Sequence, residues 1–255
     1  DGPGGYFLEY VEDIRLYGVS FGTDIGGTSV AGELSYRPNM PMQINGGDIS
    51  RGALVEFGPL AGDSTWRGNE NAAPGTYLPG YERKEFWQAS MSAVHFIDRV
   101  MGASRLALVG EVGANYISGM KTGNGVTKFG RDSLFGQSPF ADGTCSSQGT
   151  TPKADSWCEN DGYFTDFSWG YRMRASLDYS NVIAGINLSP NIAWSHDVEG
   201  YSPNFNENAK SISIGLNADY ANKYNASISY TNFFDGKYNT LVDRDFAAVS
   251  FGVSF

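Results

Sequence analysis

The C-terminal residues of the chain alternate between an apolar set and a set of small side chains. The odd positions are Ala247, Val249, Phe251, Val253 and Phe255, whereas the even positions hold only Ala, Ser and Gly. A period of two places successive side chains on opposite faces of a β-strand. The pattern therefore predicts a strand over 247–255 with one apolar face and one polar face.

Eight further segments follow the same period. They cover residues 14–23, 28–38, 86–96, 105–118, 165–179, 182–195, 210–220 and 224–234. Each runs for about 10 to 15 residues, whereas strands of soluble sheets have typically about 5–6. A soluble β-sandwich also alternates, but this length suits a tilted strand that crosses a bilayer in about 9–11 residues. The pattern predicts nine antiparallel membrane-spanning strands.

The predicted connections are alternately short and long. The short ones are 24–27, 97–104, 180–181 and 221–223, and the long ones are 39–85, 119–164, 196–209 and 235–243. Outer-membrane barrels have short periplasmic turns and long external loops. The fold class that follows is an all-β, antiparallel up-and-down transmembrane β-barrel, with extracellular loops 39–85 and 119–164.

Aromatic residues of the apolar face fall near the strand ends. Those on the loop side are Tyr36, Trp87, Tyr116, Trp169 and Trp194, and those on the turn side are Phe21, Tyr179, Tyr220, Tyr224 and Phe255. Two aromatic belts at the lipid–water boundaries account for this. Nine is an odd number, and bacterial single-chain barrels have even strand numbers. We therefore expect either that residues 1–255 are a portion of a larger barrel with further upstream strands, or that the chain holds one more strand than the pattern reveals.

Composition removes some classes of function. The net charge of -10 argues against a nucleic-acid partner, because phosphate binding needs a basic face. No run of 18 apolar residues exists, so no transmembrane helix is predicted. Cys145 and Cys158 have no histidine nearby for a metal site. A disulfide between them is favoured, which implies an oxidising compartment. In the chain-entropy model this bond would stabilise the folded loop by roughly 3 kcal/mol.

Five charged residues fall on the polar face of the predicted strands. They are Glu33, Arg37, Glu111, Arg172 and Arg174. If residue 118 faces residue 165 in an antiparallel pair, Glu111 faces Arg172, and we expect an ion pair between them. These charges either hold the barrel wall together or line the lumen and tune a passage.

Other candidate chemistry is weak. Ser195, His196 and Asp197 are adjacent, but neighbouring strand residues point to opposite faces and do not form a catalytic relay. The other histidine, His95, is expected near a turn at the membrane boundary. The acidic residues of 119–164 lack EF-hand spacing. We expect no enzyme activity, no metal and no cofactor.

A family resemblance adds to this pattern. Residues Tyr10–Phe21 (YVEDIRLYGVSF) and Gly32–Gln43 (GELSYRPNMPMQ) resemble a proteobacterial family of outer-membrane proteins, the domain of unknown function 1302. The resemblance covers essentially the whole chain and corresponds to the C-terminal half to two-thirds of such a protein. It implies an outer-membrane location and, loosely, a role with hydrophobic compounds, without a substrate or catalytic residues.

The expected function is an outer-membrane channel or transporter of a Gram-negative bacterium for small hydrophobic or amphipathic compounds. Loops 39–85 and 119–164 would restrict the pore, and the first is apolar enough to fold inward as a plug or to form part of a hydrophobic ligand site. Its apolar residues are Met40, Met42, Ile44, Leu54, Val55, Phe57 and Leu60. The alternative is a non-transporting docking barrel, with a filled lumen, that anchors a periplasmic or surface partner.

The expected partners follow from the location. They are outer-membrane lipid and lipopolysaccharide, a small hydrophobic ligand and a periplasmic or envelope protein. The barrel assembly machinery would bind the C-terminal strand, through an insertion signal formed by Val249, Phe251, Val253 and Phe255.

Overall fold

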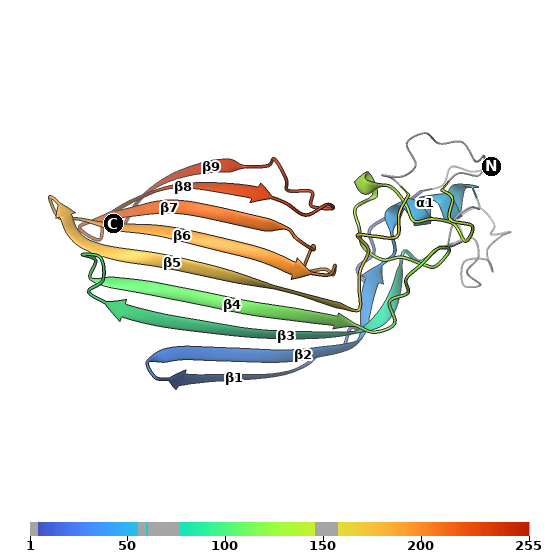
Figure 1. The fold of residues 1–255 in the computed structure, drawn as a ribbon, viewed down its shortest axis with the longest axis horizontal. Helices are drawn as coiled ribbons and strands as arrows, with labels where there is room; N and C mark the ends of the chain where they lie inside the picture. The colour runs from blue at the N-terminus through green and yellow to red at the C-terminus, as the bar shows by residue number, and fades with distance from the viewer. Residues whose placement is uncertain (1–4, 56–59, 61–76, 146–157, 255) are drawn as a thin grey trace.

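Nine strands form one antiparallel sheet in the computed structural model, which describes residues 5–55, 60, 77–145 and 158–254. The strands are β1 (Tyr17–Ile25), β2 (Thr28–Gln43), β3 (Tyr81–Asp98), β4 (Arg105–Ile117), β5 (Phe167–Ile183), β6 (Ile186–Glu199), β7 (Lys210–Tyr220), β8 (Tyr224–Phe234) and β9 (Phe246–Val253). Each strand pairs with its neighbours in sequence, so the sheet runs in order from β1 to β9 (Figure 1). The prediction of nine antiparallel strands is confirmed.

The pairing of β2 with β3 continues further than the sequence pattern predicted. The register shifts between Arg37 and Met40, and pairing then resumes from Met40 opposite Lys84 to Gln43 opposite Tyr81. Pro38 lies at this irregularity and has no N–H to donate to the ladder, so a bulge is the usual solution. The two strands thus extend beyond the bulge, and the predicted loop 39–85 begins later and ends earlier.

The first strand begins later than the sequence pattern predicted. The backbone N–H of Arg15 donates to Asn39 Oδ1 at 2.9 Å, and Asn39 Nδ2 donates to the carbonyl of Asp13 at 2.7 Å. Because the bulge residue Asn39 holds this segment, ladder pairing starts only at Tyr17.

The β5–β6 hairpin is longer than predicted. The expected turn at 180–181 is wrong, because the strands continue to Ile183 and Ile186. The two linking residues, Ala184 and Gly185, have φ values of 51° and 86°. Positive φ at both central residues is the conformation of a tight hairpin turn whose twist matches that of the strands.

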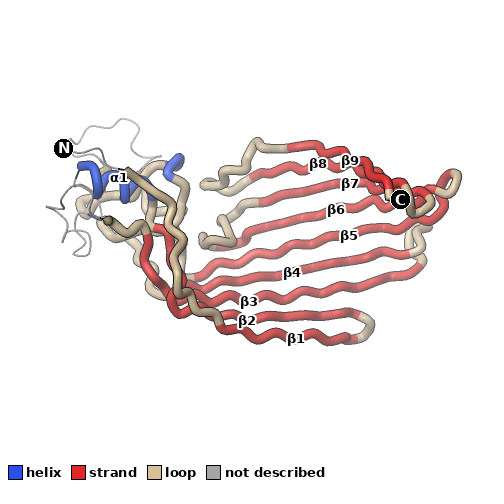
Figure 2. The backbone as a smooth tube through the Cα atoms, turned by 180° about the vertical axis from the view of Figure 1, so that it is seen from behind, coloured by secondary structure: helices blue, strands red, loops and turns tan. Residues whose placement is uncertain are grey.

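Short turns and long connections lie at opposite ends of the sheet. The β1–β2, β3–β4, β5–β6 and β7–β8 turns gather at one end, and the long segments between β2 and β3 and between β4 and β5 leave the other end (Figures 1 and 2). The predicted alternation of connection lengths is confirmed.

The sheet is open. β1 pairs only with β2, and β9 pairs only with β8, within the described part of the chain. The structure therefore supports an all-β antiparallel sheet, without closure into a barrel.

The two faces of the sheet differ sharply in chemistry. Directly paired residues share a face, and the register places large apolar side chains on one face of every strand. Many of them are exposed: Val19, Phe21, Met91, Leu108, Val112, Met173, Ile192, Ile214, Ile228, Val249 and Phe251. The opposite face carries mainly Ser, Gly, Asn and the charged residues. The alternation predicted from the sequence is confirmed.

A cap follows the long-loop end of β2, β3 and β4; we use this name for the described residues of 40–86 and 117–164. It contains the helix α1 (Gly46–Val55) and the short 3-10 turn η2 (Ser133–Phe135). Its core consists of Met42, Ile44, Leu60, Phe86, Ile117 and Phe129, with Met40 packed against it. The side chains of Leu54, Val55 and Phe57 lie outside the described part. The described apolar residues of loop 39–85 therefore fill a core shared with 117–164.

Candidate functional site

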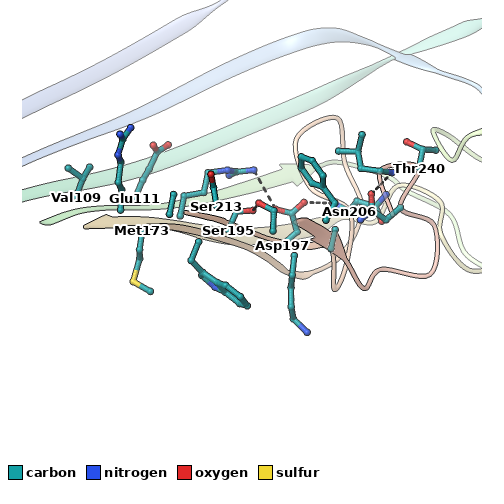
Figure 3. Close-up of a pocket in the computed structure, with 18 residues that line it drawn as sticks. Val109, Glu111, Met173, Ser195, Asp197, Asn206, Ser213 and Thr240 are labelled. Carbon is teal, nitrogen blue, oxygen red and sulfur yellow. Dashed lines mark hydrogen bonds and ion pairs between the residues drawn. The ribbon is translucent and has the colours of Figure 1, made fainter. Parts of the chain in front are cut away.

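A cavity of about 610 Å³ opens on the polar face near the long-loop end of the sheet. Strands β4 to β7 contribute Glu111, Arg172, Arg174, Ser195, Asp197, Ser211 and Ser213, and the loops after β6 and β8 contribute Asn206, Ala209 and Leu241. Figure 3 shows Glu111, Ser195 and Ser213 projecting from one face and Met173 from the other. The period of two thus gathers polar side chains from four neighbouring strands around one space.

The predicted strand register is confirmed, but the predicted ion pair is wrong. Glu111 does face Arg172 across the β4–β5 pair. The Arg172 guanidinium nevertheless pairs with Asp197, with 3.5 Å from Nη2 to Oδ1, and Glu111 forms no ion pair among the described residues. Asp197 is diagonal to Arg172, because Arg172 pairs with Ser195. The long arginine side chain reaches this diagonal neighbour.

Asp197 is held in place by the following loop. Its Oδ2 accepts a hydrogen bond from the backbone N–H of Asn206 at 2.9 Å, and its backbone N–H donates to the carbonyl of Ala209. A carboxylate held by a backbone hydrogen bond attracts the guanidinium more effectively than the exposed carboxylate of Glu111. The loop therefore decides which acid Arg172 meets.

Residues 200–209, which we call the β6–β7 loop, fold onto the polar face of the sheet. Asn115 Nδ2 donates to Ser202 Oγ at 2.9 Å and to Asn204 Oδ1 at 2.8 Å. Phe205 is 6% exposed and lies on Gly113 and Gly170, which face each other across β4 and β5. The β6–β7 loop thus packs on the polar face of the sheet, whereas the restriction of a pore was predicted for 39–85 and 119–164.

A second cavity, of about 300 Å³, lies between this loop and the cap. It shares Asp197, Asn206 and Thr240 with the first cavity, and Arg131, Tyr201 and Tyr238 also line it. The two cavities therefore adjoin, and the β6–β7 loop lines both.

The cap and two further loops meet at Arg131. Its guanidinium lies 4.0 Å from the ring centroid of Tyr163 and 5.3 Å from that of Tyr238, and it donates to the carbonyl of Asp161 at 2.7 Å. Tyr238 belongs to the β8–β9 loop and also contacts Tyr201 of the β6–β7 loop, with 5.8 Å between ring centroids. Cation–π contacts in such a buried place contribute on the order of 1–2 kcal/mol each. Three segments distant in sequence are thereby held together.

An ion pair joins the β8–β9 loop to the cap. Lys237 Nζ lies 2.5 Å from Glu159 Oε2 and 3.8 Å from Asp161 Oδ2. Burial acts to raise the pKa of Glu159, but the hydrogen bond and charge of Lys237 outweigh it and hold that pKa below its usual value. The hydrogen bond to Glu159 in turn raises the pKa of Lys237. Both charged forms are thus stabilised by the docked loops.

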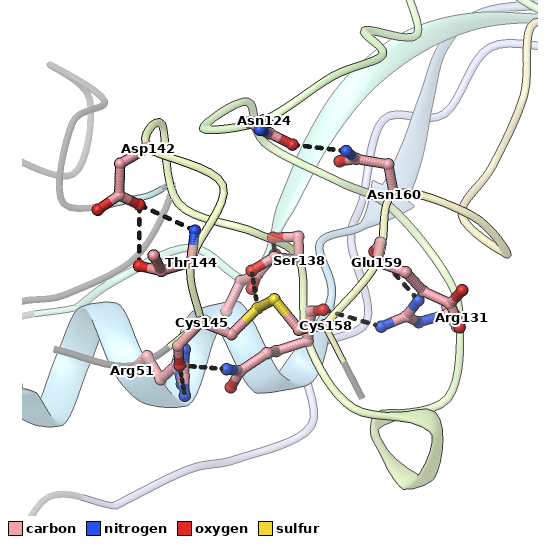
Figure 4. Close-up of a disulfide and its surroundings, with 12 residues drawn as sticks. Arg51, Asn124, Arg131, Ser138, Asp142, Thr144, Cys145, Cys158, Glu159 and Asn160 are labelled. Atoms are coloured by element: carbon pink, nitrogen blue, oxygen red, sulfur yellow. Dashed lines mark hydrogen bonds between the residues drawn. A yellow bond between two sulfur atoms is a disulfide. The ribbon is translucent and has the colours of Figure 1, made fainter. Parts of the chain in front are cut away.

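The predicted disulfide between Cys145 and Cys158 is confirmed (Figure 4). Arg51 Nη2, from α1, donates to the carbonyl of Cys145 at 3.0 Å, and Gln137 Nε2 donates to the same oxygen at 2.7 Å. The hydrogen bonds of Arg51 and Gln137 to Cys145 therefore connect one end of the disulfide to α1 and to the segment at Gln137.

The cap also buries an acidic side chain. Asp48 Oδ2 accepts from Ser138 Oγ at 2.7 Å, and burial raises the pKa of Asp48. Asn45 caps α1 by accepting from the N–H groups of Gly47 and Asp48. These contacts satisfy buried polar groups of the cap and are remote from the residues that line the larger cavity.

The other predicted lumen-lining residues lie apart from the cavity. Glu33 stands on the polar face of β2 between Ser20 and Ser90. Arg37 Nη1 donates to Gln88 Oε1 at 3.4 Å, and its guanidinium lies over the Phe86 ring. Of the five predicted residues, the structure brings together Glu111, Arg172 and Arg174.

The adjacent residues Ser195, His196 and Asp197 alternate as expected. Ser195 Oγ lies 2.8 Å from Ser211 Oγ on the polar face, whereas the His196 ring lies on the apolar face beside Tyr171 and Trp194. His95 Nδ1 is 2.9 Å from Thr28 Oγ1, beside the β1–β2 turn. The histidine and the serine therefore do not converge.

The described residues contain no group of three or more His, Cys, Asp or Glu side chains arranged to hold a metal ion. None of their helices has the length and apolar character needed to span a membrane.

Comparison with known proteins gives a family but no close relative. The model of an uncharacterised family, described as protein of unknown function (DUF1302), matches residues 1–255. No curated protein and no solved structure matches the chain. Since the family model covers the chain from end to end, this protein belongs to the DUF1302 family.

Proposed function

We propose that this chain forms part of an outer-membrane β-barrel whose apolar face meets lipid and whose polar face lines a passage. One observation carries the proposal. The apolar face of the nine-stranded sheet is exposed, whereas the hydrophobic side chains that are buried lie in the cap and loops or on the other face. Soluble proteins rarely expose continuous apolar surfaces of this size. A bilayer is the environment in which such a face is stable.

Aromatic side chains support the same placement. Tyr17, Tyr36, Trp87, Tyr116 and Phe167 follow one another across β1 to β5, each paired with the next. This row stands on the apolar face near the long-loop end, where a lipid–water boundary would lie. At the turn end, Tyr220 and Tyr224 are paired and stack with 6.3 Å between centroids.

Closure of the barrel requires further strands. In an antiparallel meander the direction reverses at each strand, so β1 and β9 run in the same direction. Antiparallel closure between them therefore needs an odd number of additional strands. Without these strands both edges would leave unpaired backbone groups in lipid, which costs several kcal/mol for each group.

Transport is favoured by the arrangement on the polar face. The cavity at Arg172 and Arg174 adjoins a second cavity among the loops, and the β6–β7 loop lines both. Phe205 of this loop lies against the wall and narrows the passage. Small hydrophobic or amphipathic compounds are the proposed cargo, since apolar residues line the larger cavity beside the arginines.

Placement in lipid can be tested with a pair of neighbouring substitutions. Ile214 is on the apolar face and 55% exposed, whereas Ser213 is on the polar face of the same strand. We expect Ile214→Lys to destabilise the closed barrel, with its additional strands, in lipid vesicles by about 2–4 kcal/mol and Ser213→Lys to have much less effect. Equal effects of the two lysines on folding into vesicles would contradict the proposed orientation.

The passage itself can be tested by conductance in planar bilayers. We expect Phe205→Ala to raise single-channel conductance, because the ring lies on the polar face between two glycines. The matched control is Phe251→Ala on the apolar face, for which no change is expected. The measurement uses the closed barrel, with its additional strands. If neither the unchanged barrel nor its Phe205→Ala variant conducts after verified insertion, the non-transporting docking barrel becomes the better interpretation.

A further inference from the structure

We propose that the cavity on the polar face binds an amphipathic organic monoanion, with the anionic head at Arg174 and Arg172 and the apolar body directed across the cavity toward Phe233 and Leu241. The inference rests on the proposed function, because the polar face must be enclosed for the cavity to meet solutes. It goes further by naming the charge and shape of the ligand and the residues that recognise it.

Arg174 has the donors that such a ligand needs. Its one hydrogen bond within the described residues joins Nη2 to Asn191 Oδ1 at 3.4 Å, and it forms no ion pair there. A guanidinium has five N–H donors in a planar fork that matches a carboxylate. Most donor capacity of Arg174 is thus open to a ligand.

Arg172 lies next to Arg174 on the same face. The two residues are separated by one position in β5, which places their Cα atoms about 6–7 Å apart. Arg172 is only partly engaged, since its contact with Asp197 is 3.5 Å long and that carboxylate also accepts from Asn206. Its side chain is 53% exposed. One anionic group can therefore be reached by both guanidinium groups.

The remaining lining selects for an apolar body. Phe233 of β8 and Leu241 of the following loop, which is 44% exposed, form an apolar side of the cavity across from the arginines. Val109, which is 41% exposed, lies directly beside Arg174 on β4. The cavity of about 610 Å³ falls in the range of sites for drug-sized ligands, roughly 300–1,000 Å³. A small inorganic anion would leave most of it unfilled.

Glu111 limits the charge of the ligand. It lines the cavity directly opposite Arg172 and forms no ion pair among the described residues. Its carboxylate repels a second negative charge. A ligand with one anionic head is therefore preferred to a dianion.

The test uses three probes of one shape: 4-phenylbutyrate, its amide and 4-phenylbutylammonium. Binding to the full chain in lipid nanodiscs is measured by titration calorimetry, with empty nanodiscs subtracted. We expect the carboxylate to bind about tenfold more tightly than the amide, the ratio that follows from a charge-assisted hydrogen bond, and the ammonium to bind most weakly. Equal affinities of the three probes, or no saturable binding of the carboxylate, would overturn the proposal before any substitution is made.

Substitutions then locate the site. We expect Arg174→Gln to weaken 4-phenylbutyrate about tenfold and Glu111→Gln to tighten it. Arg105→Gln is the matched control, because Arg105 is on the same face but pairs with Asp178 at the turn end. An unchanged Kd for Arg174→Gln, or an equal loss for Arg105→Gln, would contradict the assignment.

The proposed binding site and the proposed channel can be contradicted independently of each other. A chain that binds the carboxylate selectively but does not conduct keeps this site and overturns the channel proposal. A chain that conducts but binds all three probes alike overturns this site and keeps the channel.

Discussion

Phe205 lies on Gly170 so closely that the glycine has no room for a side chain. A Cβ at Gly170 would come within 3.0 Å of Phe205 Cδ1 and 2.7 Å of the His196 carbonyl oxygen. Gly113, which faces Gly170 across the β4–β5 pair, has Phe205 Cζ 3.2 Å from its Cβ position. The two glycines leave a flat surface, which we call the seat, and the Phe205 ring packs on it. This contact holds the β6–β7 loop against the sheet.

Gly170→Ala should therefore release the loop from the sheet. The added methyl group overpacks the contact and should cost about 1–3 kcal/mol of unfolding free energy. Hydrogen exchange in residues 200–209 should rise. The control is Gly110→Ala, because a Cβ at Gly110 meets no atom within 4 Å. Unchanged exchange in 200–209 for Gly170→Ala would contradict the seat.

Asn115→Ala should loosen the same loop by a different route. It removes the donors to Ser202 and Asn204 in a buried place. The expected loss is about 1–3 kcal/mol, the usual cost of leaving buried partners unsatisfied. Limited proteolysis within 200–209 reports the loosening. Asn217→Ala on the exposed polar face of β7 should leave cleavage unchanged, and equal cleavage of both variants would argue against a specific role of Asn115.

Loss of the disulfide should destabilise the cap and leave the sheet paired. The bond joins residues 13 apart in sequence, and the chain-entropy model assigns such a loop about 3 kcal/mol. The double variant Cys145→Ser and Cys158→Ser should lose exchange protection around Gln137 and Arg51. Protection in β7 and β8 should persist, and a loss there of equal size would show that cap and sheet unfold as one unit.

Docking of the β8–β9 loop on the cap should weaken in acid. The pKa of Glu159 is lowered by its contact with Lys237. The stabilisation that ionised Glu159 gives to the docked loop is therefore present above the pKa of the unfolded state, about 4.3, and is lost as pH falls through the lower pKa of the folded state. Protection factors of amides in 235–243, corrected for intrinsic exchange, should drop between about pH 5 and 3. The drop should be modest, because Lys237 is 58% exposed and solvent screens the pair.

Glu159→Gln provides the comparison for this pH response. Without the carboxylate, protection in 235–243 should be lower at pH 7 and nearly independent of pH down to 3. A pH response that persists in Glu159→Gln would assign it to another group.

The two-residue period was enough to predict most of the sheet. In strands such as 210–220 and 224–234 every second residue except Lys210 and Asn232 is apolar, so the face, the length and the register follow from local geometry. The pairing of Glu111 with Arg172 could be derived in the same way, because antiparallel register needs only one fixed point. The turn at Ala184 and Gly185 was missed, because alternation shows where side chains point and not where the chain reverses.

The charged contacts and the inward loop could not be derived from the pattern. Arg172 pairs with Asp197 rather than with Glu111 because the backbone N–H of Asn206 fixes the carboxylate of Asp197, whereas the Glu111 side chain is exposed. Gly113 and Gly170 were visible as small residues on the polar face, but only the fold shows that Phe205 rests on them.

The sequence alone thus determined the nine strands, their two faces and the ends at which their connections lie, since each depends on neighbours within a few residues. Tertiary structure decided which long connection covers the polar face and which of two acids Arg172 meets. It also decided that the apolar residues of 39–85 form the core of a cap. These outcomes depend on contacts between segments up to about a hundred residues apart, for which local alternation carries no information.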